Sequence, residues 1–356
     1  MIRWPDNRFM QALRTRLPLI QAPMAGGATT PELVAAVSNS GALGSLAAGY
    51  LQPGAITTAI QHIRKLTASP FAVNLFIPEN HAATAYQMEA ARKAVQKCCA
   101  ELNFTVDSPK PPYAPHFEEQ IAALLEEEVP AISFTFGVLA KPWIDECKNR
   151  GIVLMGTATT LEEAQALEEE QIDLVVAQGS EAGGHRGTFL GKAEEALNST
   201  ASLVTTLQGK IKIPVIAAGG IMNAQGIVSA LKQGAAGVQM GTAFLCCPES
   251  GIHPDYKNAL LRAEKNQTAL TRAFSGKLAR GLGNLFMTRM QSHAIDILDY
   301  PIQNALTSPM RKEAVKQGKL DFMSLFAGKG AHLCSISSAA DLIRQWEKEI
   351  ESLLAR

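Results

Sequence analysis

The chain has 356 residues, of which 47% are apolar and only 6% aromatic. This length suits one large α/β barrel with additions or two ordinary domains, and the abundance of small and aliphatic residues favours buried parallel strands under helices. The 33 basic and 33 acidic residues balance, which excludes the strong electrostatic field that attracts nucleic acid or an anionic membrane surface.

Two further classes of protein are disfavoured by local composition. The segment 1–16 carries four arginines and no apolar core of the kind that a signal peptide needs. The apolar runs are strand-sized, so we expect no membrane span. The six cysteines form no Cys-x-x-Cys and no Cys/His spacing typical of zinc. We therefore expect reduced thiols, no metal and a cytoplasmic location.

Strand-like and helix-like stretches alternate from the N-terminus. The expected strands are 19–23, 42–46, 71–75, 131–135, 152–156, 173–177, 214–218 and 237–240. The clearest expected helices are 31–40, 53–66, 161–170 and 223–233. Eight βα units predict a (β/α)₈ TIM barrel of the α/β class. The rival, a doubly wound open sheet, is disfavoured because no Gly-x-Gly-x-x-Gly follows the first strand.

Two segments interrupt this repeat. The first, residues 81–115, inserts a helix after the third strand. The second, residues 253–330, is too long for one βα connection and lacks strand periodicity, so we expect a small, mostly helical cap that forms the substrate region. Residues 1–252 would then form the barrel, and residues 331–356 a C-terminal helix that returns to the barrel wall.

A glycine-rich loop follows the sixth expected strand. Residues 178–189 contain four glycines and one histidine, His185. This composition makes the loop flexible, disfavours a helix or a strand interior, and lets the backbone approach a flat or charged ligand closely. Because the loop lies at a strand's C-terminal end, His185 is a candidate catalytic residue. The alternative is a surface turn with an incidental histidine.

The last two strands also end in glycines. Gly219 and Gly220 end the seventh strand and open a helix whose free N–H groups can hold an anion. The run Gln239-Met240-Gly241-Thr242 ends the eighth strand, and Thr242 adds a hydroxyl. Barrel enzymes commonly bind phosphate after strands seven and eight, so the pair predicts a phosphate cup.

Other strand ends offer groups for a flat ring. The run Ala22-Pro23-Met24 after the first strand can lie against a planar ring, while Asn74 and Gln178 offer amides for a heterocycle edge. A phosphate together with a polar-edged ring favours FMN over a phosphosugar. The alternative for Asn74 and Gln178 is ordinary capping of loops.

Several of these segments resemble the nitronate monooxygenases, also called 2-nitropropane dioxygenases. The segments that carry the resemblance are 18–27, 71–76, 133–137, 178–189, 213–245 and 275–281. Flavin-dependent enoyl-ACP reductases and some flavin NADH:quinone reductases share the glycine loop and the segment 213–245. The run His185-Arg186-Gly187-Thr188-Phe189 and the run Phe134-Thr135-Phe136-Gly137 favour the monooxygenase branch.

The resemblance implies FMN as cofactor and makes His185 the active-site histidine. The expected cofactor contacts, from the strand ends and the family pattern together, are Ala22, Pro23, Met24, Asn74, Gln178, Gly183, Gly184, Gly219, Gly220, Gln239, Met240, Gly241 and Thr242. Tyr300 and Lys329 are expected to bind substrate. Both stand where the chain departs from the family: Lys329 replaces a glutamine found in many relatives, and only one tyrosine is present near residue 300 where some relatives have two.

The implied activity is oxidation of alkyl nitronates, propionate 3-nitronate among them, with O₂ to a carbonyl compound and nitrite. His185 would hold the anionic substrate as a cation, or act as a base on a neutral nitroalkane. The partners would be a small anionic nitro compound and O₂, with no nucleic acid or membrane, in a monomer or homodimer. One alternative is an FMN-dependent NAD(P)H reductase of an enoyl thioester or quinone. Another is a non-redox barrel isomerase or lyase of a phosphosugar.

Overall fold

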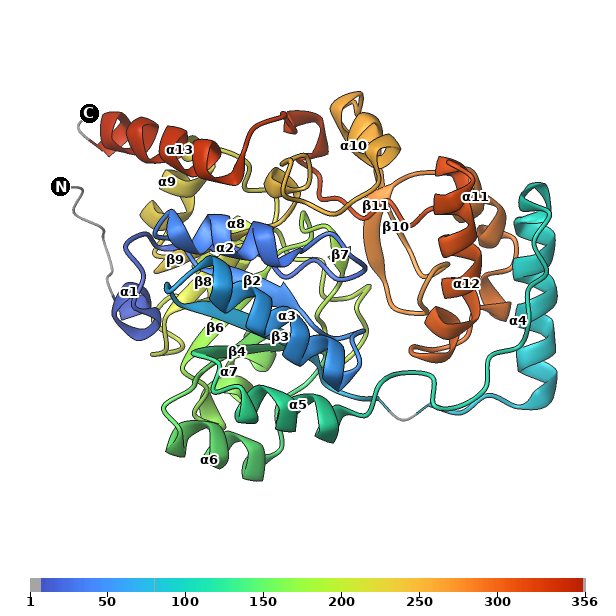
Figure 1. Cartoon of the computed structure of the whole chain (residues 1–356), viewed down its shortest axis with the longest axis horizontal. Coiled ribbons are helices and arrows are strands. Elements are labelled where there is room, and N and C mark those ends of the chain that lie inside the picture. The colour runs from blue at the N-terminus through green and yellow to red at the C-terminus, as the bar shows by residue number, and fades with distance from the viewer. Residues whose placement is uncertain (1–7, 80, 355–356) are drawn as a thin grey trace.

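The computed structural model describes residues 8–79 and 81–354, and its central feature is a parallel barrel (Figure 1). The barrel strands are β1 (Leu19–Gln21), β2 (Gly44–Ala47), β3 (Phe71–Phe76), β4 (Ala131–Thr135), β5 (Val153–Ala158), β6 (Leu174–Gln178), β8 (Val215–Ala218) and β9 (Gly237–Met240). They pair in the order β1-β9-β8-β6-β5-β4-β3-β2, and a parallel bridge between Ile20 and Leu43 joins the two ends. The predicted (β/α)₈ TIM barrel is confirmed.

Eight helices cover the outside of the barrel. They are α2 (Pro31–Asn39), α3 (Pro53–Leu66), α5 (Phe117–Glu126), α6 (Lys141–Asn149), α7 (Leu161–Glu169), α8 (Thr200–Leu207), α9 (Ala224–Lys232) and α13 (Ala339–Leu354). Side-chain caps mark several starts: Thr30, Thr160 and Asn223 each accept the backbone N–H three residues on. Helix α13 packs against α9 and α2, so it is the eighth helix of the barrel although most of the second lobe precedes it.

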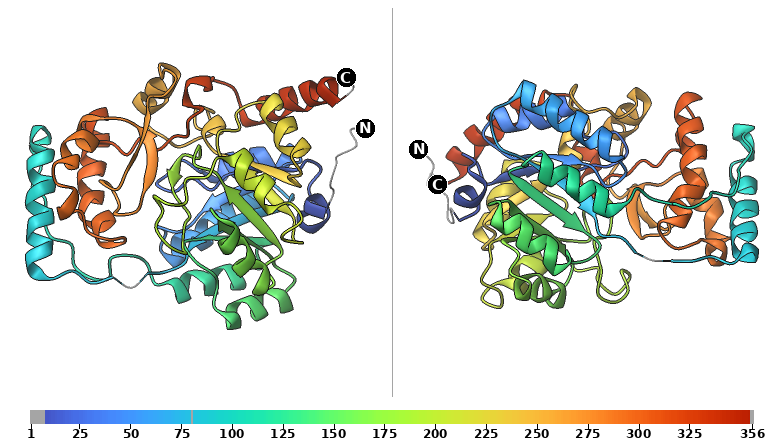
Figure 2. Two further views of the ribbon diagram at one scale, coloured as in Figure 1. Left: turned by 180° about the vertical axis from the view of Figure 1, so that it is seen from behind. Right: turned by 60° about the horizontal axis from the view of Figure 1, so that its bottom comes forward.

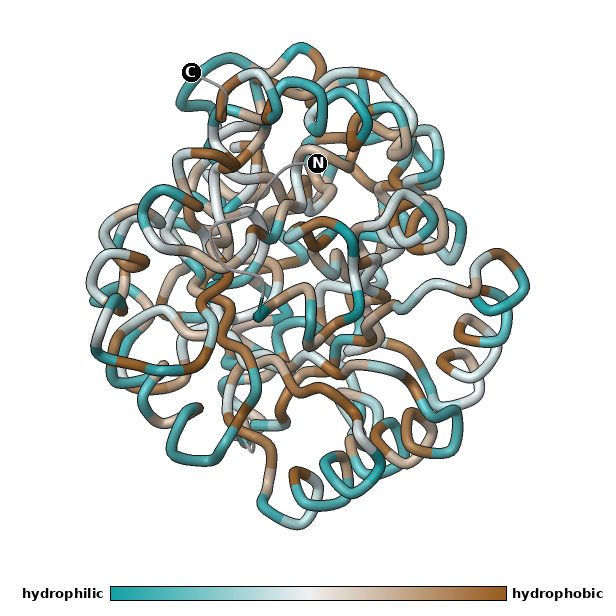
Figure 3. The backbone as a smooth tube through the Cα atoms, turned by 90° about the vertical axis from the view of Figure 1, so that its left-hand side faces the viewer, coloured by the Kyte–Doolittle hydropathy of each residue, from teal (hydrophilic) through white to brown (hydrophobic). Residues whose placement is uncertain are grey.

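The interior of the barrel is apolar and is closed at its N-terminal end. Ile20, Met155 and Ile216 belong to the inner cluster, which the short helix α1 (Arg8–Leu13) joins through Phe9 and Leu13. A Cβ on Gly237 would lie 2.9 Å from the Phe9 ring, so the helix sits tightly under the strands. The hydrophilic stretches lie mainly on the outer turns in Figure 3.

A second lobe stands beside the barrel (Figures 1 and 2). Its helices are α4 (Ala85–Cys98), α10 (Pro254–Leu261), α11 (Leu285–Gln291) and α12 (Ile302–Lys316). They share a separate apolar cluster to which Val95 and Cys98 of α4 contribute along with Phe274, Phe286 and Met310. The insertion after β3 and the long segment after β9 are therefore packed together. The exact division into residues 1–252, 253–330 and 331–356 stays a prediction.

The second lobe also contains strands that the sequence pattern did not reveal. Strands β10 (Thr268–Thr271) and β11 (Ala279–Leu282) form an antiparallel sheet with β7 (Gly184–His185), in the order β10-β11-β7. Strand β7 is part of the glycine loop, in which we expected no strand. Two- and four-residue strands are too short to show a period, and β7 exists because Arg280 and Ala279 pair with it.

Short 3₁₀ turns complete the structure. They span Ala100–Leu102, Thr242–Phe244, Ala294–Asp296, Leu320–Phe322 and Ala331–Leu333. Within residues 8–79 and 81–354, we find no helix that combines the length and the apolar character needed to cross a membrane.

Candidate active site

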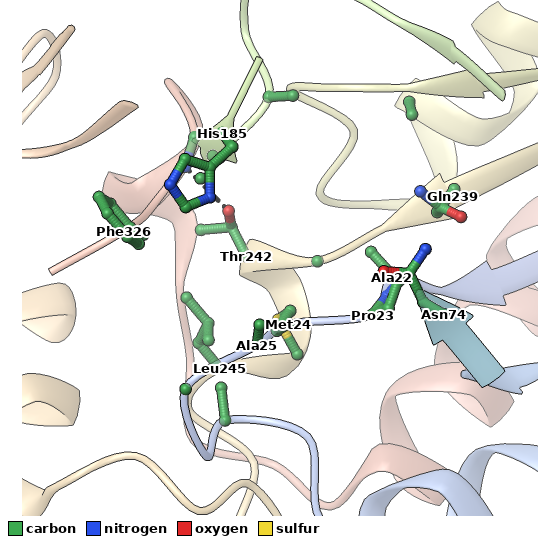
Figure 4. Close-up of a pocket in the computed structure, with 18 of the residues that line it drawn as sticks. Ala22, Pro23, Met24, Ala25, Asn74, His185, Gln239, Thr242, Leu245 and Phe326 are labelled. Carbon is green, nitrogen blue, oxygen red and sulfur yellow. Dashed lines mark hydrogen bonds between the residues drawn. The ribbon is translucent and has the colours of Figure 1, made fainter. Parts of the chain in front are cut away.

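A cavity of about 330 Å³ opens at the C-terminal ends of the barrel strands, facing the second lobe (Figure 4). The strand ends and the glycine loop supply most of its wall, and the segment from β9 into α10, the helix α12 and the segment after α12 supply the rest. The expected cofactor residues that line it are Ala22, Pro23, Met24, Asn74, Gln178, Gly183, Gly184, Gly219, Gly220, Gln239, Met240, Gly241 and Thr242. The fold thus brings all of these residues, and His185, to one cavity.

Two buried charges hold the glycine loop in place. Arg186 is 2% exposed, and its guanidinium donates to the carbonyls of Gly179 (2.6 Å), Gln178 (3.0 Å) and Ala196 (3.0 Å). Glu163 is fully buried and accepts from the backbone N–H of Leu190 (2.9 Å) at the far end of the loop. A loop that is flexible by composition is therefore fixed by contacts with the rest of the fold.

The Gln178 side chain is a further part of this support. Its Nε2 donates to the His185 carbonyl at 2.9 Å, and its Oε1 accepts from the Gly187 N–H at 2.8 Å. The amide therefore holds the backbone on both sides of Arg186. Its second Nε2–H remains for a ligand. Asn74, by contrast, donates to the Ser133 hydroxyl at 3.0 Å and forms no hydrogen bond through Oδ1 within the described residues. Its acceptor oxygen is available to a ligand.

His185 projects among aromatic rings. The ring centroids of Phe326, Phe136 and Tyr300 lie 5.3, 5.8 and 6.4 Å from that of the imidazole, and Phe76 lies 6.5 Å away. Burial, and to a smaller extent the positive charges of Lys277 and Arg311, lower the pKa of His185 to about 3. The imidazole is therefore neutral at pH 7.

Ser275 orients this imidazole. Its Oγ lies 2.7 Å from His185 Nε2 and 3.3 Å from the Lys277 carbonyl, to which the hydroxyl can donate. The hydroxyl then accepts from Nε2–H, which leaves Nδ1 as the unprotonated nitrogen. Ser275 lies in a segment that resembles the family, but sequence reasoning assigned it no role because nothing in the sequence connects it to His185.

The predicted phosphate cup is built from closely spaced backbone. Gly219 and Gly220 have φ values of +122° and +72°, and a Cβ on Gly220 would lie 3.0 Å from the Glu181 Cβ. The second lobe contributes here as well, since the Gly328 N–H donates to Thr242 Oγ1 at 2.9 Å. A Cβ on Gly183 would come within 2.5 Å of the Gly328 nitrogen, so this close approach requires glycine.

The two expected substrate residues lie differently. Tyr300 is 4% exposed and stacks at a tilt on Phe136, with 5.6 Å between centroids, behind the rings that face the cavity. Lys329 has an exposed side chain, and its backbone N–H donates to the Glu181 carbonyl beside the cup. Neither residue lines the cavity itself, whereas Tyr50 and Arg311, which we did not predict, do so.

Comparison with known proteins agrees with this geometry. The sequence model of the nitronate monooxygenase family matches residues 7–349. The chain belongs to the nitronate monooxygenase family. The members of this family are flavin-dependent oxidoreductases, so the alternative of a non-redox isomerase or lyase is ruled out. A relative from Staphylococcus saprophyticus, described as a probable nitronate monooxygenase, is 41% identical over 353 residues, covering 99% of each chain.

Two solved structures resemble this protein over almost its whole length. The nitroalkane oxidase from Streptomyces ansochromogenes superimposes with a TM-score of 0.91 at 37% identity, covering 98% of this chain and 99% of that one. FabK from Thermotoga maritima superimposes with a TM-score of 0.78 at 28% identity, covering 100% of this chain and 98% of that one. The greater likeness is to the nitroalkane oxidase.

Proposed function

We propose that the protein is an FMN-dependent monooxygenase that oxidises alkyl nitronates, propionate 3-nitronate in particular, with O₂ to a carbonyl compound and nitrite. The observation that carries the proposal is the position of His185, which is set among aromatic rings at a cavity that also contains a glycine-built cup. Membership of the family supports the class of reaction.

The lining residues fit FMN as the flavin. The backbone N–H groups at Gly220 and at Gly241–Thr242 would hold the phosphate, and the amides of Asn74 and Gln239 would meet the polar edge of the ring. Pro23 and Met24 would lie against the ring face, at the same end of the cavity as Asn74 in Figure 4. When bound, FMN supplies the redox chemistry that moves electrons from the substrate to O₂.

His185 has two roles in this proposal, according to the substrate. With a neutral nitroalkane, Nδ1 takes the proton from the carbon that carries the nitro group, and the Ser275 hydroxyl keeps Nε2–H in place. With a nitronate already formed, the approaching negative charge raises the pKa of the imidazole and favours its protonated form. The rings of Phe76, Phe136 and Phe326 exclude water, which strengthens either interaction.

The two expected substrate residues remain part of the proposal. The contact of Tyr300 with His185 supports a role in shaping the substrate space. The place of Lys329 between two cavity glycines supports a role at the mouth. We also propose a cytoplasmic location, because all six cysteines are free and five of them are buried. A monomer or homodimer stays our expectation for the assembly.

Oxygen uptake tests the proposal. FMN-loaded protein should consume O₂ and release nitrite when given propionate 3-nitronate. The likeness to FabK makes a reductase the alternative to examine, so NADH and NADPH should be added to the same protein without oxygen. Failure to bleach the flavin would agree with the monooxygenase. Rapid bleaching by NADH or NADPH, with no oxygen uptake on any nitronate, would overturn it.

A further inference from the structure

Arg311 is a half-buried cation in the cavity wall without an acidic partner among the described residues. It lies on α12, and its Nη2 donates to Asn304 Oδ1 at 2.7 Å and to the Asn304 carbonyl at 3.2 Å. Its Nε is buried and forms no hydrogen bond, and within the described residues Arg311 has no ion pair. No Asp or Glu is among the described residues that line the cavity. The guanidinium therefore has donors to spare and no counter-charge.

Tyr50 presents a second unused donor in the same wall. It follows β2, and its hydroxyl is buried without a hydrogen-bond partner. Burial raises the pKa of Tyr50 to about 12, against the opposing effect of the Arg311 charge, so the hydroxyl keeps its proton at pH 7. A buried donor without an acceptor is unfavourable unless a ligand supplies one.

The other cation that acts on His185 is already compensated. Lys277 Nζ lies 2.7 Å from Glu79 Oε1 and above the Phe136 ring, 4.4 Å from its centroid. Arg311 therefore differs from Lys277 in having a charge that a ligand could neutralise.

We propose that Arg311 and Tyr50 form a subsite for the carboxylate of a substrate whose nitronate end lies at His185. This inference rests on the proposed function and deepens it, because it makes the preferred substrate a nitronate with a second, carboxylate anion. Phe76 connects the two ends: its ring centroid lies 5.3 Å from that of Tyr50 and 6.5 Å from that of His185. A short acyclic chain lying along Phe76 would reach both.

A carboxylate fits this subsite better than an uncharged group would. The guanidinium keeps Nε–H and Nη1–H groups that Asn304 does not use, each able to form a charge-assisted hydrogen bond to a carboxylate, and the Tyr50 hydroxyl can add a further donor. The phosphate of the cofactor would have its own donors in the backbone at Gly220 and Thr242. The subsite would therefore distinguish substrates by their second charge and not by the nitronate that all of them share.

The test compares two nitronates of equal chain length in the FMN-loaded protein. Propionate 3-nitronate carries the carboxylate, and propyl 1-nitronate lacks it. Arg311→Gln should raise KM for propionate 3-nitronate about 10- to 100-fold, the usual range for a lost hydrogen bond to a charged group. KM for propyl 1-nitronate should change less than about 3-fold. Tyr50→Phe should raise KM for propionate 3-nitronate alone, by about 2- to 10-fold.

A neighbouring residue provides the matched control. Lys312 is the next residue on α12 and is exposed, so Lys312→Gln removes a charge of the same sign and should leave both KM values unchanged. An equal loss on both nitronates in Arg311→Gln would overturn the subsite, as would no loss on either. Loss of FMN from Arg311→Gln would also overturn it, since Arg311 would then hold the cofactor.

A binding measurement separates this inference from the proposed function. Calorimetric titration of the FMN-loaded protein without oxygen should show that 3-nitropropionate loses about 10-fold or more in affinity in Arg311→Gln, while 1-nitropropane loses none. If the unchanged protein oxidised neither nitronate yet bound 3-nitropropionate through Arg311, the proposed function would fail and the subsite would stand. Equal affinity of 3-nitropropionate for the two proteins would remove the subsite whatever the turnover.

Discussion

The barrel and the second lobe contribute to the cavity by different means. The barrel offers backbone: left-handed glycines that follow β8, the run Gln239–Thr242 at the end of β9, and a glycine loop fixed by buried contacts. The second lobe offers side chains, among them Ser275, Arg311 and Phe326. Backbone donors recognise a phosphate without regard to side-chain identity, whereas side chains can be exchanged to suit a substrate. We therefore expect the barrel backbone to retain the cofactor, and side chains of the lobe, together with Tyr50 from the barrel, to select the substrate.

A substitution at Gly220 tests whether the barrel backbone retains the cofactor, and it should have the largest effect. A Gly220→Leu variant needs a left-handed φ that leucine rarely adopts, and its side chain would meet Glu181. We expect colourless protein, measured as flavin absorbance per mole of protein. Gly209→Leu is the matched control, because Gly209 also has a positive φ (+71°) but nothing within 4 Å. Full flavin content in Gly220→Leu would contradict the phosphate cup.

His185 tests whether chemistry can be lost while the cofactor stays. His185→Asn should keep FMN and lose about 10²- to 10⁴-fold in turnover of neutral nitroalkanes, the usual worth of one general base. Nitronates ionised beforehand should still be oxidised if His185 acts as the base. A comparable loss on both would indicate charge stabilisation instead, and unchanged turnover on both would leave His185 without a catalytic role. Nitrite release and oxygen uptake measure the turnover of both kinds of substrate.

The support behind the glycine loop can be weakened without touching the cavity wall. Glu163 accepts hydrogen bonds from the backbone of Thr159, Phe189 and Leu190, and glutamine would point two N–H groups at some of these donors. Glu163→Gln should lower the free energy of unfolding by about 1.5–3 kcal/mol. The control variant Glu162→Gln, at the exposed neighbouring position, should change the free energy of unfolding by less than about 1 kcal/mol. Urea denaturation measures both, and equal effects would mean that the buried carboxylate is dispensable.

The smallest expected effect is the pH dependence that His185 adds to stability. Its pKa is about 3 in the folded protein and near 6.5 when unfolded, so the unfolded state binds more protons between these values. The free energy of unfolding is therefore unaffected by this proton above pH 6.5, and it decreases as the pH falls from 6.5 towards 3. As the pH falls from 6.5 to 5, the free energy of unfolding of the unchanged protein should decrease by about 1–2 kcal/mol more than that of His185→Asn. Parallel curves for the two proteins would show that the imidazole is not buried as a neutral group.

The sequence was sufficient for the barrel because its signals are local and repeated. The limits of α3 and β4, and the C-terminal ends of most strands to within one residue, followed from periodicity and glycines, and the strand ends then indicated which residues would share a cavity. The same reasoning missed β7, since a two-residue strand exists only through pairing with β11. It missed Arg311 because a cation on a partly exposed helix looks like any other until the fold brings it to the same cavity wall as Tyr50.

The position of α13 bears on how the protein is made. Trp346 on this helix packs edge-on against Phe244, and the helix covers the seam between α9 and α2. A ribosome that has finished β9 has therefore synthesised every strand of the barrel but not its last outer helix. About a hundred residues, most of them in the second lobe, must be synthesised before that helix follows. The barrel is thus sealed only after the segment that would contribute to substrate choice has been synthesised, so a chain terminated within that segment would also lack the helix that seals the barrel.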